Sequence, residues 1–512
     1  MAKALPSSVI IVGSGVFGLG TAYELATRSK DIDITVIERC PFPAPDGSSI
    51  DSSRIIRADY ASLPYAKLMT EAMPHWRGAF GAEGRYTESG LALLNNSATA
   101  DASAEHFLED ALRNVTETLG LKKGKKEDGG QITVFDRAAD TIPVVSENLA
   151  NAKGYVNWTS GWAHAEDGVK YMRRQVEALG RVKFLTAEVT RLLFSSSDVE
   201  GVILKDGSRM KADLTILATG AWTPALIDLR GIASATGQVM AYVNISPEEE
   251  AHHSQAGQPV LLCEDDGMFI IPPRDGILKV ARHGYGYANP VRIPHPEVRG
   301  ETITVSLPRT GVTHPNMQIP PEGDAACRAF LRKAIPSMGE RPWTNTRICW
   351  YTDTVSGDWL ISYHPKYSGL FVATGGSGHG YKFLPIIGGR IVDVIEGRDR
   401  DELGSELRKR WAWPKERIEA DHVWTNDWRG EGRKGMVLDE EYAKGDAKAR
   451  FSHRRGKPLS SSTHVSRLQT IVRINLLVNV HGSPIVKETF RVSAFGLMTS
   501  SPARLYVLGR PQ

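Results

Sequence analysis

The stretch Ser8-Val9-Ile10-Ile11-Val12-Gly13-Ser14-Gly15-Val16-Phe17-Gly18, near the start of the chain, decides the fold. Its apolar, β-branched run predicts a buried strand, and the glycines that follow predict a tight turn into a helix. In such a unit Gly13 permits the turn, Gly15 lets a phosphate approach the backbone, and Gly18 allows close packing of helix on strand. The motif therefore predicts a dinucleotide site, with the pyrophosphate at the positive end of the helix.

The next strand, Ile34 to Ile37, ends at Glu38, where a carboxylate is expected to accept hydrogen bonds from ribose hydroxyls. Glycine turns also occur in α/β proteins of other kinds, but this context favours a dinucleotide. Glu38 disfavours a 2′-phosphate, whereas the neighbouring Arg39 would tolerate one. The motif alone does not separate NAD from FAD.

Two later segments, Asp213 to Trp222 and Phe371 to Gly380, also read as an apolar strand followed by a glycine turn. The simpler interpretation is that these two are ordinary strand ends. Three such turns far apart in sequence nevertheless suit a long cofactor that lies across one sheet, which favours FAD.

Composition bounds the remaining possibilities. A chain of 512 residues and 56.1 kDa is expected to form at least two domains. The segment 226–345 has many β-branched runs broken by Pro and Gly, which predicts a second domain built largely of sheet. A net charge of +3 is too small to indicate nucleic acid. The four cysteines lack metal-ligand spacing, so we expect neither a metal site nor a disulfide framework.

The sequence also shows no recognisable targeting signal. No apolar run is long enough to span a bilayer, the N-terminus lacks the layout of a signal peptide, and the last residues are not a peroxisomal tripeptide. We therefore expect a cytoplasmic or peroxisomal protein without a membrane partner. The segment 450–512 differs, because nine basic residues follow Arg450 against a single acid, Glu488. It is interpreted as a loosely attached basic tail or as an anchor for an anionic surface.

Five motifs together resemble the sarcosine oxidase and fructosyl amino acid oxidase (amadoriase) family, which includes pipecolate and saccharopine oxidases. They are GSGVFG at 13–18, DSSRIIRADY at 51–60, LKVARH at 278–283, RICWYTDTVSGDWLISYHP at 347–365 and SGHGYKFLPIIGG at 377–389. The resemblance covers roughly residues 8–445. It implies a two-domain α/β amine oxidoreductase with a Rossmann-like FAD domain and a mixed-sheet substrate domain. The expected FAD domain comprises 1–90, 155–225 and 350–449, and the expected substrate domain comprises 91–154 and 226–349.

The resemblance implies that FAD is bonded covalently through Cys349. A cysteine before a tryptophan is otherwise a small buried apolar residue, as we expect of Cys40, Cys263 and Cys327. Lys279 matches a family lysine that lies over the flavin and activates dioxygen, although on its own it reads as a lysine at a strand end. His283 matches a histidine near the substrate; taken alone, it would be a structural imidazole.

Three further cations complete the expected site. The resemblance implies that Arg57 and Lys382 hold the substrate carboxylate and that Arg54 lies near the flavin, with Lys279, His283 and Arg54 as the catalytic groups. Taken alone, Arg54 and Arg57 suit a solvated helix face. The residues expected to contact the cofactor are Gly13, Gly15, Val16, Phe17, Gly18, Glu38, Arg39, Ser53, Arg54, Cys349, Gly378, Gly380 and Lys382.

The expected activity is oxidation of the C–N bond of a secondary-amine amino acid such as saccharopine, pipecolate or an N-methyl amino acid. The partners would be that small molecule and dioxygen, the product hydrogen peroxide, and the protein a monomer. Amadoriases tend to lack the second arginine and to carry an acid near the position of His283, so fructosyl amino acids are a less favoured substrate class. The motifs are also compatible with an N-methylated aromatic amino acid of a natural-product pathway, with a dehydrogenase, and with a flavin-bound interaction protein without turnover.

Overall fold

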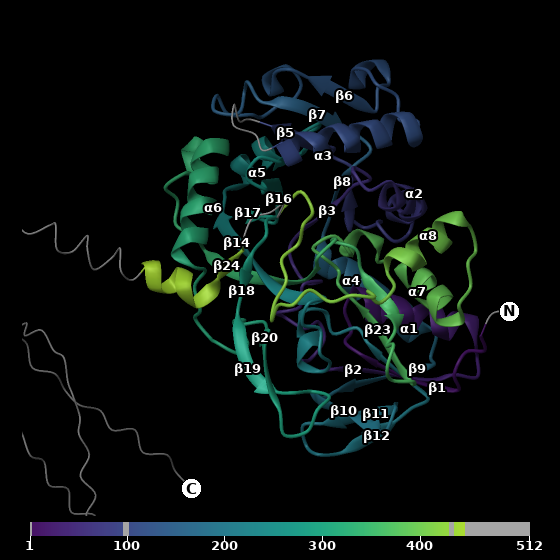
Figure 1. The fold of residues 1–512 in the computed structure, drawn as a ribbon. Helices are drawn as coiled ribbons and strands as arrows, with labels where there is room; N and C mark the ends of the chain where they lie inside the picture. The colour runs from purple at the N-terminus through teal and green to yellow at the C-terminus, as the bar shows by residue number, and fades with distance from the viewer. Residues whose placement is uncertain (1–2, 96–101, 430–434, 446–512) are drawn as a thin grey trace, which may run out of the picture. The chain divides into compact units, whose positions relative to one another are not determined.

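The strand of the glycine motif lies at the centre of a six-stranded sheet (Figure 1). The computed structural model describes residues 3–95, 102–429 and 435–445. The strand order is β22-β23-β13-β1-β2-β9, parallel throughout except for the antiparallel pair of β22 and β23. The strands are β1 Ser8–Val12, β2 Asp33–Glu38, β9 Val182–Thr186, β13 Leu214–Leu217, β22 Leu360–Tyr363 and β23 Leu370–Thr374. The three predicted strands that precede glycine turns are therefore neighbours in one sheet, as expected of a site that crosses it.

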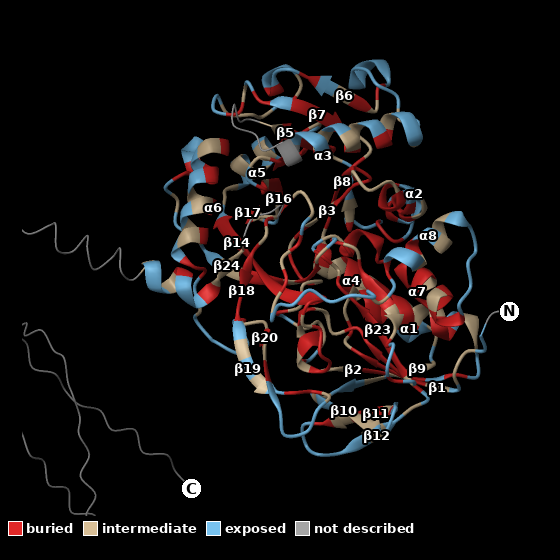
Figure 2. Ribbon diagram, viewed as in Figure 1, coloured by how far each residue is buried: buried red, intermediate tan, exposed pale blue. Residues whose placement is uncertain are grey.

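Both faces of this sheet are covered, which explains why its inner strands β1, β13 and β23 are almost wholly buried, whereas the edge strand β9 is not (Figure 2). Val9 and Ile11 point into a core shared with helices, and Ile10 and Val12 point into a core shared with a small antiparallel sheet, because alternate side chains leave opposite faces of a strand. The helices are α1 Val16–Arg28, α2 Leu63–Arg77, α4 Ala165–Ala178, α7 Ile387–Glu396 and α8 Glu402–Arg410. The small sheet is β10 Val189–Ser195, β11 Asp198–Leu204 and β12 Arg209–Lys211.

A second, ten-stranded sheet supplies the other half of the described structure. Its path runs β24-β18-β14-β17-β16-β15-β5-β7-β6, and β21 pairs with β14 off this path. The strands are β5 Leu91–Asn95, β6 Ile132–Phe135, β7 Lys153–Asn157, β14 Ala233–Asn244, β15 Val260–Cys263, β16 Met268–Arg274, β17 Ile277–Arg282, β18 Tyr287–Ala288, β21 Asn345–Thr354 and β24 Met436–Val437. The helices along this part of the chain are α3 Ala102–Arg113, α5 Pro247–His253 and α6 Pro321–Ala334. The strand-rich composition of residues 226–345 was thus a correct indication of sheet.

Two further small sheets contain the remaining described strands. One joins β3 Arg54–Ile56, β8 Gly161–Ala163 and β4 Tyr86–Thr87, and the other is the hairpin of β19 Pro290–Pro294 and β20 Thr302–Ser306. The interpretation of Arg54 and Arg57 as part of a solvated helix face is wrong. Arg54 begins a strand, and Arg57 follows that strand with only 5% of its surface exposed.

The basic segment 450–512 lies outside the described residues, so both interpretations of it stay predictions. Within the described ranges, no helix is both long and apolar enough to cross a membrane.

Candidate active site

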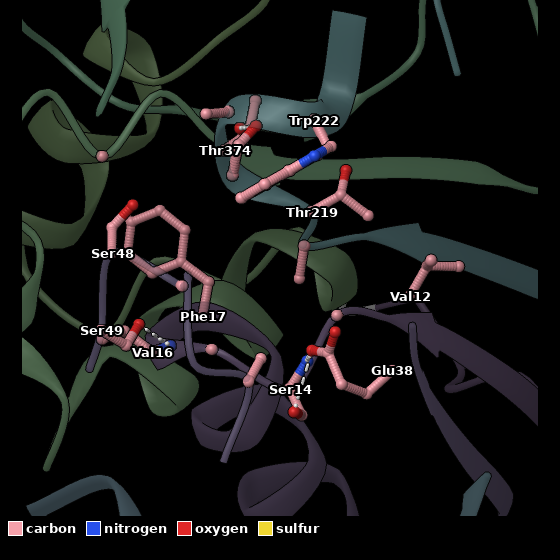
Figure 3. Close-up of a pocket in the computed structure, with 18 of the residues that line it drawn as sticks. Val12, Ser14, Val16, Phe17, Glu38, Ser48, Ser49, Thr219, Trp222 and Thr374 are labelled. Carbon is pink, nitrogen blue, oxygen red and sulfur yellow. Dashed lines mark hydrogen bonds between the residues drawn. The ribbon is translucent and has the colours of Figure 1, made fainter. Parts of the chain in front are cut away.

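The three glycine turns meet at the carboxyl edge of the six-stranded sheet, where they line a cavity of about 410 Å³ (Figure 3). The turn after β1 contributes Gly13 to Phe17, the turn after β13 contributes Ala218 to Trp222, and the turn after β23 contributes residues up to Tyr381. The loop Gly47 to Ile50 closes another side. Ligands of open parallel sheets bind at this edge, so the fold places a binding site where the sequence predicted one.

The structure gives a different geometric reason for glycine at each of the three positions of the motif. Gly13 has a φ of +101°, which favours glycine, and a Cβ on Gly18 would lie 1.9 Å from the Gly13 carbonyl oxygen. Gly15 instead lines the cavity, where its nearest neighbour to a Cβ would be the Ser49 hydroxyl at 3.2 Å. Gly18 is therefore required for packing, whereas Gly15 leaves open the space that a phosphate needs beside the start of α1.

The acidic residue at the end of β2 faces the same cavity. The Ser14 backbone N–H and hydroxyl each donate to Glu38 Oε2 at 3.0 Å. Beside them Arg39 stacks on the Trp222 ring at 4.2 Å and pairs with Asp46 (Figure 3 shows Glu38, Ser14 and Trp222). A carboxylate, an open glycine turn and a helix N-terminus along one elongated cavity fit an adenine dinucleotide such as FAD.

A smaller cavity of about 70 Å³ adjoins the first, because Arg54, Tyr351, Gly378 and Tyr381 line both. Together the two cavities collect every predicted site residue except Gly18. The predicted residues that line the smaller cavity are Ser53, Arg54, Arg57, Lys279, His283, Cys349, Gly378 and Lys382.

Lys279 lies in the middle of β17 and is buried, so it is not a lysine at a strand end. Its Nζ donates to Asp51 Oδ2 at 2.6 Å and to the Ser53 carbonyl at 2.9 Å, and Arg54 pairs with the same carboxylate. Burial lowers the pKa of Lys279 to about 8, and Asp51 opposes that shift. Burial alone would raise the pKa of Asp51, but Lys279 and Arg54 hold it well below its usual range. Asp51 is therefore a single carboxylate between two cations, the buried Lys279 and the partly buried Arg54.

Cys349 is a free, buried thiol on β21, opposite Gln238 of β14. Arg54 Nη2 lies 3.5 Å from its Sγ atom. Tyr351 is two residues further along the strand, so it leaves the same face and reaches both cavities. The thiol thus lines the smaller cavity, two residues from Tyr351, which lines both.

Arg57 and Lys382 lie together although 325 residues separate them, and Tyr60 joins them. Lys382 Nζ donates to the Tyr60 hydroxyl at 2.8 Å and to the His379 carbonyl at 3.1 Å. The Arg57 guanidinium lies over the Tyr60 ring at 5.0 Å and the Phe107 ring at 5.5 Å, and its buried Nη1 has no hydrogen-bond partner among the described residues. An Arg57 nitrogen without a partner, beside a lysine that donates only to neutral groups, suits an anion.

His283 also lines the smaller cavity. Its Nδ1 lies 3.3 Å from the Tyr351 hydroxyl, and its ring packs 5.6 Å from that of Trp428. Burial, followed by the charges of Arg429 and Arg57, holds the pKa of His283 well below its usual range. The imidazole is therefore neutral at physiological pH and can accept as well as donate hydrogen bonds.

Sequence reasoning missed four residues around these cavities: Asp51, Tyr60, Tyr351 and His379. Each lies within one of the five motifs, and the spacing of Tyr351 from Cys349 is a signal that could have identified it. The pairing of Asp51 with Lys279 had no such signal, because it joins distant segments.

The other cysteines, Cys40, Cys263 and Cys327, are buried and free. Ligand atoms of Cys263, Asp265 and Asp266 lie within 4.8 Å of one another. Lys333 Nζ lies 3.8 Å from Asp265, so this group already has a neighbouring cation.

Fold and site together define an oxidoreductase that binds FAD across a doubly covered sheet. The profile of the family described as FAD dependent oxidoreductase (DAO) matches residues 8–394, and the chain belongs to that family. It is 29% identical to the amino acid oxidase imqH of Aspergillus flavus over 80% of this chain and 98% of that protein. It is 28% identical to L-saccharopine oxidase of Schizosaccharomyces pombe, over 81% of this chain and 95% of that one. The crystal structure of fructosamine oxidase (Amadoriase II) of Aspergillus fumigatus matches with a TM-score of 0.66 and 26% identity, covering 84% and 100% of the two chains.

Proposed function

We propose that the protein is an oxidase that acts on the C–N bond of an amino acid carrying a secondary amine, with dioxygen as the second substrate. The observation that carries the proposal is the pairing of Arg57 and Lys382 in a cavity that adjoins the cofactor cavity. Both are buried, and neither has a carboxylate hydrogen-bonded to it among the described residues. A substrate carboxylate bound there would be held by two cations. The names of the amino acid and saccharopine oxidases among the relatives support the same substrate class.

The chemistry that FAD supplies when bound is removal of hydride from the carbon next to nitrogen, followed by electron transfer to dioxygen to give hydrogen peroxide. The chain holds the reactants in place for it. Arg57 and Lys382 fix one end of the substrate, and neutral His283 lies where it can contact the amine without repelling it. Glu38, Arg39 and the glycine turns would hold the dinucleotide, and Cys349 would form the covalent link.

Lys279 is the proposed oxygen-activating residue. Two of its three N–H groups are used by Asp51 and Ser53, and the third has no hydrogen-bond partner within the described part of the chain, so it can point into the smaller cavity that Lys279 lines. A fixed ammonium there would stabilise the negative charge that develops as dioxygen is reduced. This role favours an oxidase over a dehydrogenase.

Residues in and near the smaller cavity bear on two further substrate classes, fructosyl amino acids and N-methylated aromatic amino acids. His283 stands where amadoriases tend to carry an acid, which disfavours fructosyl amino acids. An N-methylated aromatic amino acid is supported by nearby rings. Phe269 lines the smaller cavity, and Phe107 packs against Trp428 at 4.9 Å.

We further propose the division of the chain that was expected from the resemblance, with the cofactor bound by 1–90, 155–225 and 350–449 and the substrate covered by 91–154 and 226–349. The protein would act as a monomer in the cytoplasm or the peroxisome; relatives include a peroxisomal sarcosine oxidase of Mus musculus. Gel filtration and cell fractionation test these two points.

The proposed function is tested by a peroxide-coupled screen of secondary amino acids and their decarboxylated amines. Arg57→Ala should weaken turnover of the amino acids by roughly 10- to 100-fold, because a charge-assisted contact is lost, and leave the amines much less affected. Equal losses for both classes would remove the carboxylate assignment. Absence of peroxide together with flavin reduction would favour a dehydrogenase.

A further inference from the structure

The side chains around Lys382 form a basic cluster, defined here as Arg57, His283, His379, Lys382 and Arg429. They come from the segment after β3, the end of β17, the glycine turn after β23 and the segment after α8. Their charges act on one another, since Lys382 and Arg57 lower the pKa of both His283 and His379. Arg429 is paired with Asp353 and Asp427, so its charge is already balanced.

Lys382 is different, because its described neighbours offer it no anion. Its Nζ donates to a phenol, Tyr60, and to a backbone carbonyl, that of His379. The Tyr60 hydroxyl in turn contacts His379 Nδ1 at 3.2 Å, and the Tyr60 ring stacks on Tyr65 of α2. Every described group that faces this amine is therefore neutral or positive.

A buried amine in such surroundings is poorly charged. Burial, and after it the Arg57 guanidinium, hold the pKa of Lys382 well below its usual range. An acid that acts on Arg57 is Glu264, whose two oxygens are buried without partners among the described residues, and burial raises its pKa to about 8. Glu264 is thus mostly protonated at neutral pH and does not serve as a counter-ion.

We propose that Lys382 takes up one proton from solvent each time a carboxylate binds, so that the site gains its second positive charge only together with its ligand. This inference rests on the carboxylate site of the proposed function. The balance is simple: a neutral amine, a proton and a carboxylate form an ammonium–carboxylate pair, and no covalent bond is made or broken. The bound anion supplies the opposite charge that the pocket lacks, which raises the affinity of the amine for its proton.

The sign of the pH dependence follows from this linkage. The pKa of Lys382 is low in the empty site and higher in the occupied site, so binding is strongest below the lower of the two values. Between the two values, carboxylate affinity should fall by about tenfold for each unit that the pH rises. A site with a permanently charged lysine would show no such fall in that range.

The test uses the flavin-loaded protein and two carboxylates that lack an amine and cannot be oxidised in this way, propionate and phenylacetate. Binding is measured by titration calorimetry near neutral pH in buffers of different ionisation enthalpy, and the slope of the observed enthalpy against that quantity counts the protons taken up. We expect about one proton per bound carboxylate and an affinity that declines with pH.

Three variants assign the proton. Lys382→Arg keeps a cation that stays charged, so it should bind the same carboxylates with no proton uptake and little dependence on pH. Lys382→Met should lose most of the affinity. Glu264→Gln, the matched control, removes the acid that acts on Arg57 and should leave the uptake unchanged.

Some results would overturn this inference and leave the proposed function intact. They include binding of propionate without proton uptake and proton uptake that survives in Lys382→Arg. Uptake that disappears in Glu264→Gln would assign the proton to Glu264 instead and also overturn it. If neither carboxylate binds to the wild-type protein, the carboxylate site itself fails, and with it the proposed function.

Discussion

At the scale of single residues, the placement of Cys349 depends on register. Pairing of β21 with β14 sets Cys349 opposite Gln238, and Arg347 on the same strand donates from Nη1 to the Ile50 carbonyl at 2.9 Å. The strand is thereby tied to the loop that closes the larger cavity. A one-residue slip would turn the thiol to the other face of the sheet.

We predict that Cys349 carries the flavin. Denatured, acid-precipitated wild-type protein should keep its yellow colour, whereas Cys349→Ser should release the colour into the supernatant, because a hydroxyl lacks the nucleophilicity of a thiolate. Cys40→Ser is the matched control and should behave like the wild type. A colourless wild-type pellet would refute covalent attachment.

Lys279 is predicted to govern reaction with dioxygen. Lys279→Met keeps the apolar stem and removes the charge, so reoxidation of reduced enzyme should slow by roughly 100- to 1,000-fold, while anaerobic reduction by substrate changes much less. Stopped-flow measurement of the two half-reactions separates them. Reoxidation at the wild-type rate would exclude Lys279 as the oxygen-activating group.

The charge of Lys279 should also make the rate of reoxidation depend on pH. Because its pKa is lowered to about 8, the ammonium is present below that pH and is lost as the pH rises through it. Reoxidation of the dithionite-reduced enzyme should therefore decline above about pH 8. In Lys279→Met this decline should be absent, and a decline of equal size in the variant would assign the titration to another group.

At the scale of elements, the turn from β1 into α1 contains two glycines with different roles. Gly18 allows the helix to pack closely, and Gly15 lines the cofactor cavity. Gly18→Ala should lower the free energy of unfolding by about 1–3 kcal/mol or more, since the new methyl group meets the Gly13 carbonyl oxygen. Gly15→Ala should leave folding nearly intact, because its methyl group meets only the movable Ser49 side chain, but it should reduce flavin content. Denaturant unfolding of both variants in a Cys349→Ser background, freed of flavin, measures the first effect, and flavin content with Cys349 intact measures the second. Equal destabilisation by both would contradict this division.

At the scale of the whole molecule, β24, the last described strand, belongs to the large sheet, and residues 438–445 follow it as a helix. β24 pairs with β18, and Leu438 is fully buried in the core beneath it. The relative from Aspergillus flavus is matched over 98% of its length by 80% of this chain. Every predicted site residue lies before residue 446. The catalytic machinery is thus expected to be complete without residues 446–512.

Two truncations check this expectation. A chain that ends after residue 445 should keep its flavin content, turnover and melting temperature. A chain that ends after residue 434 should lose about 2–5 kcal/mol of stability, because it removes Leu438 from the core. Loss of flavin-loaded protein in the longer chain would show that the basic segment belongs to the folded structure.

The sequence by itself determined the features that depend on near neighbours. The glycine motif, the alternation of Val9 to Val12 and the position of Glu38 predicted a strand, a turn, a helix and a second strand, because period and turn chemistry are local. Likeness of five short motifs to a known family identified many of the residues that line the two cavities. The sequence said little about the order of the strands. It suggested only that the three strands before glycine turns lie in one sheet.

Tertiary structure alone decided which charges meet. Asp51 pairs with Lys279 across 228 residues, and Lys382 meets Tyr60 and a backbone carbonyl rather than a carboxylate. Tertiary structure also placed Arg54 in a strand and buried Arg57 just after it, where the sequence taken alone suggested a solvated helix face. Such pairings depend on burial and on contacts between distant segments, and burial sets whether a lysine is charged. No local pattern contains that information, because the dielectric surroundings of a side chain exist only after the chain has folded.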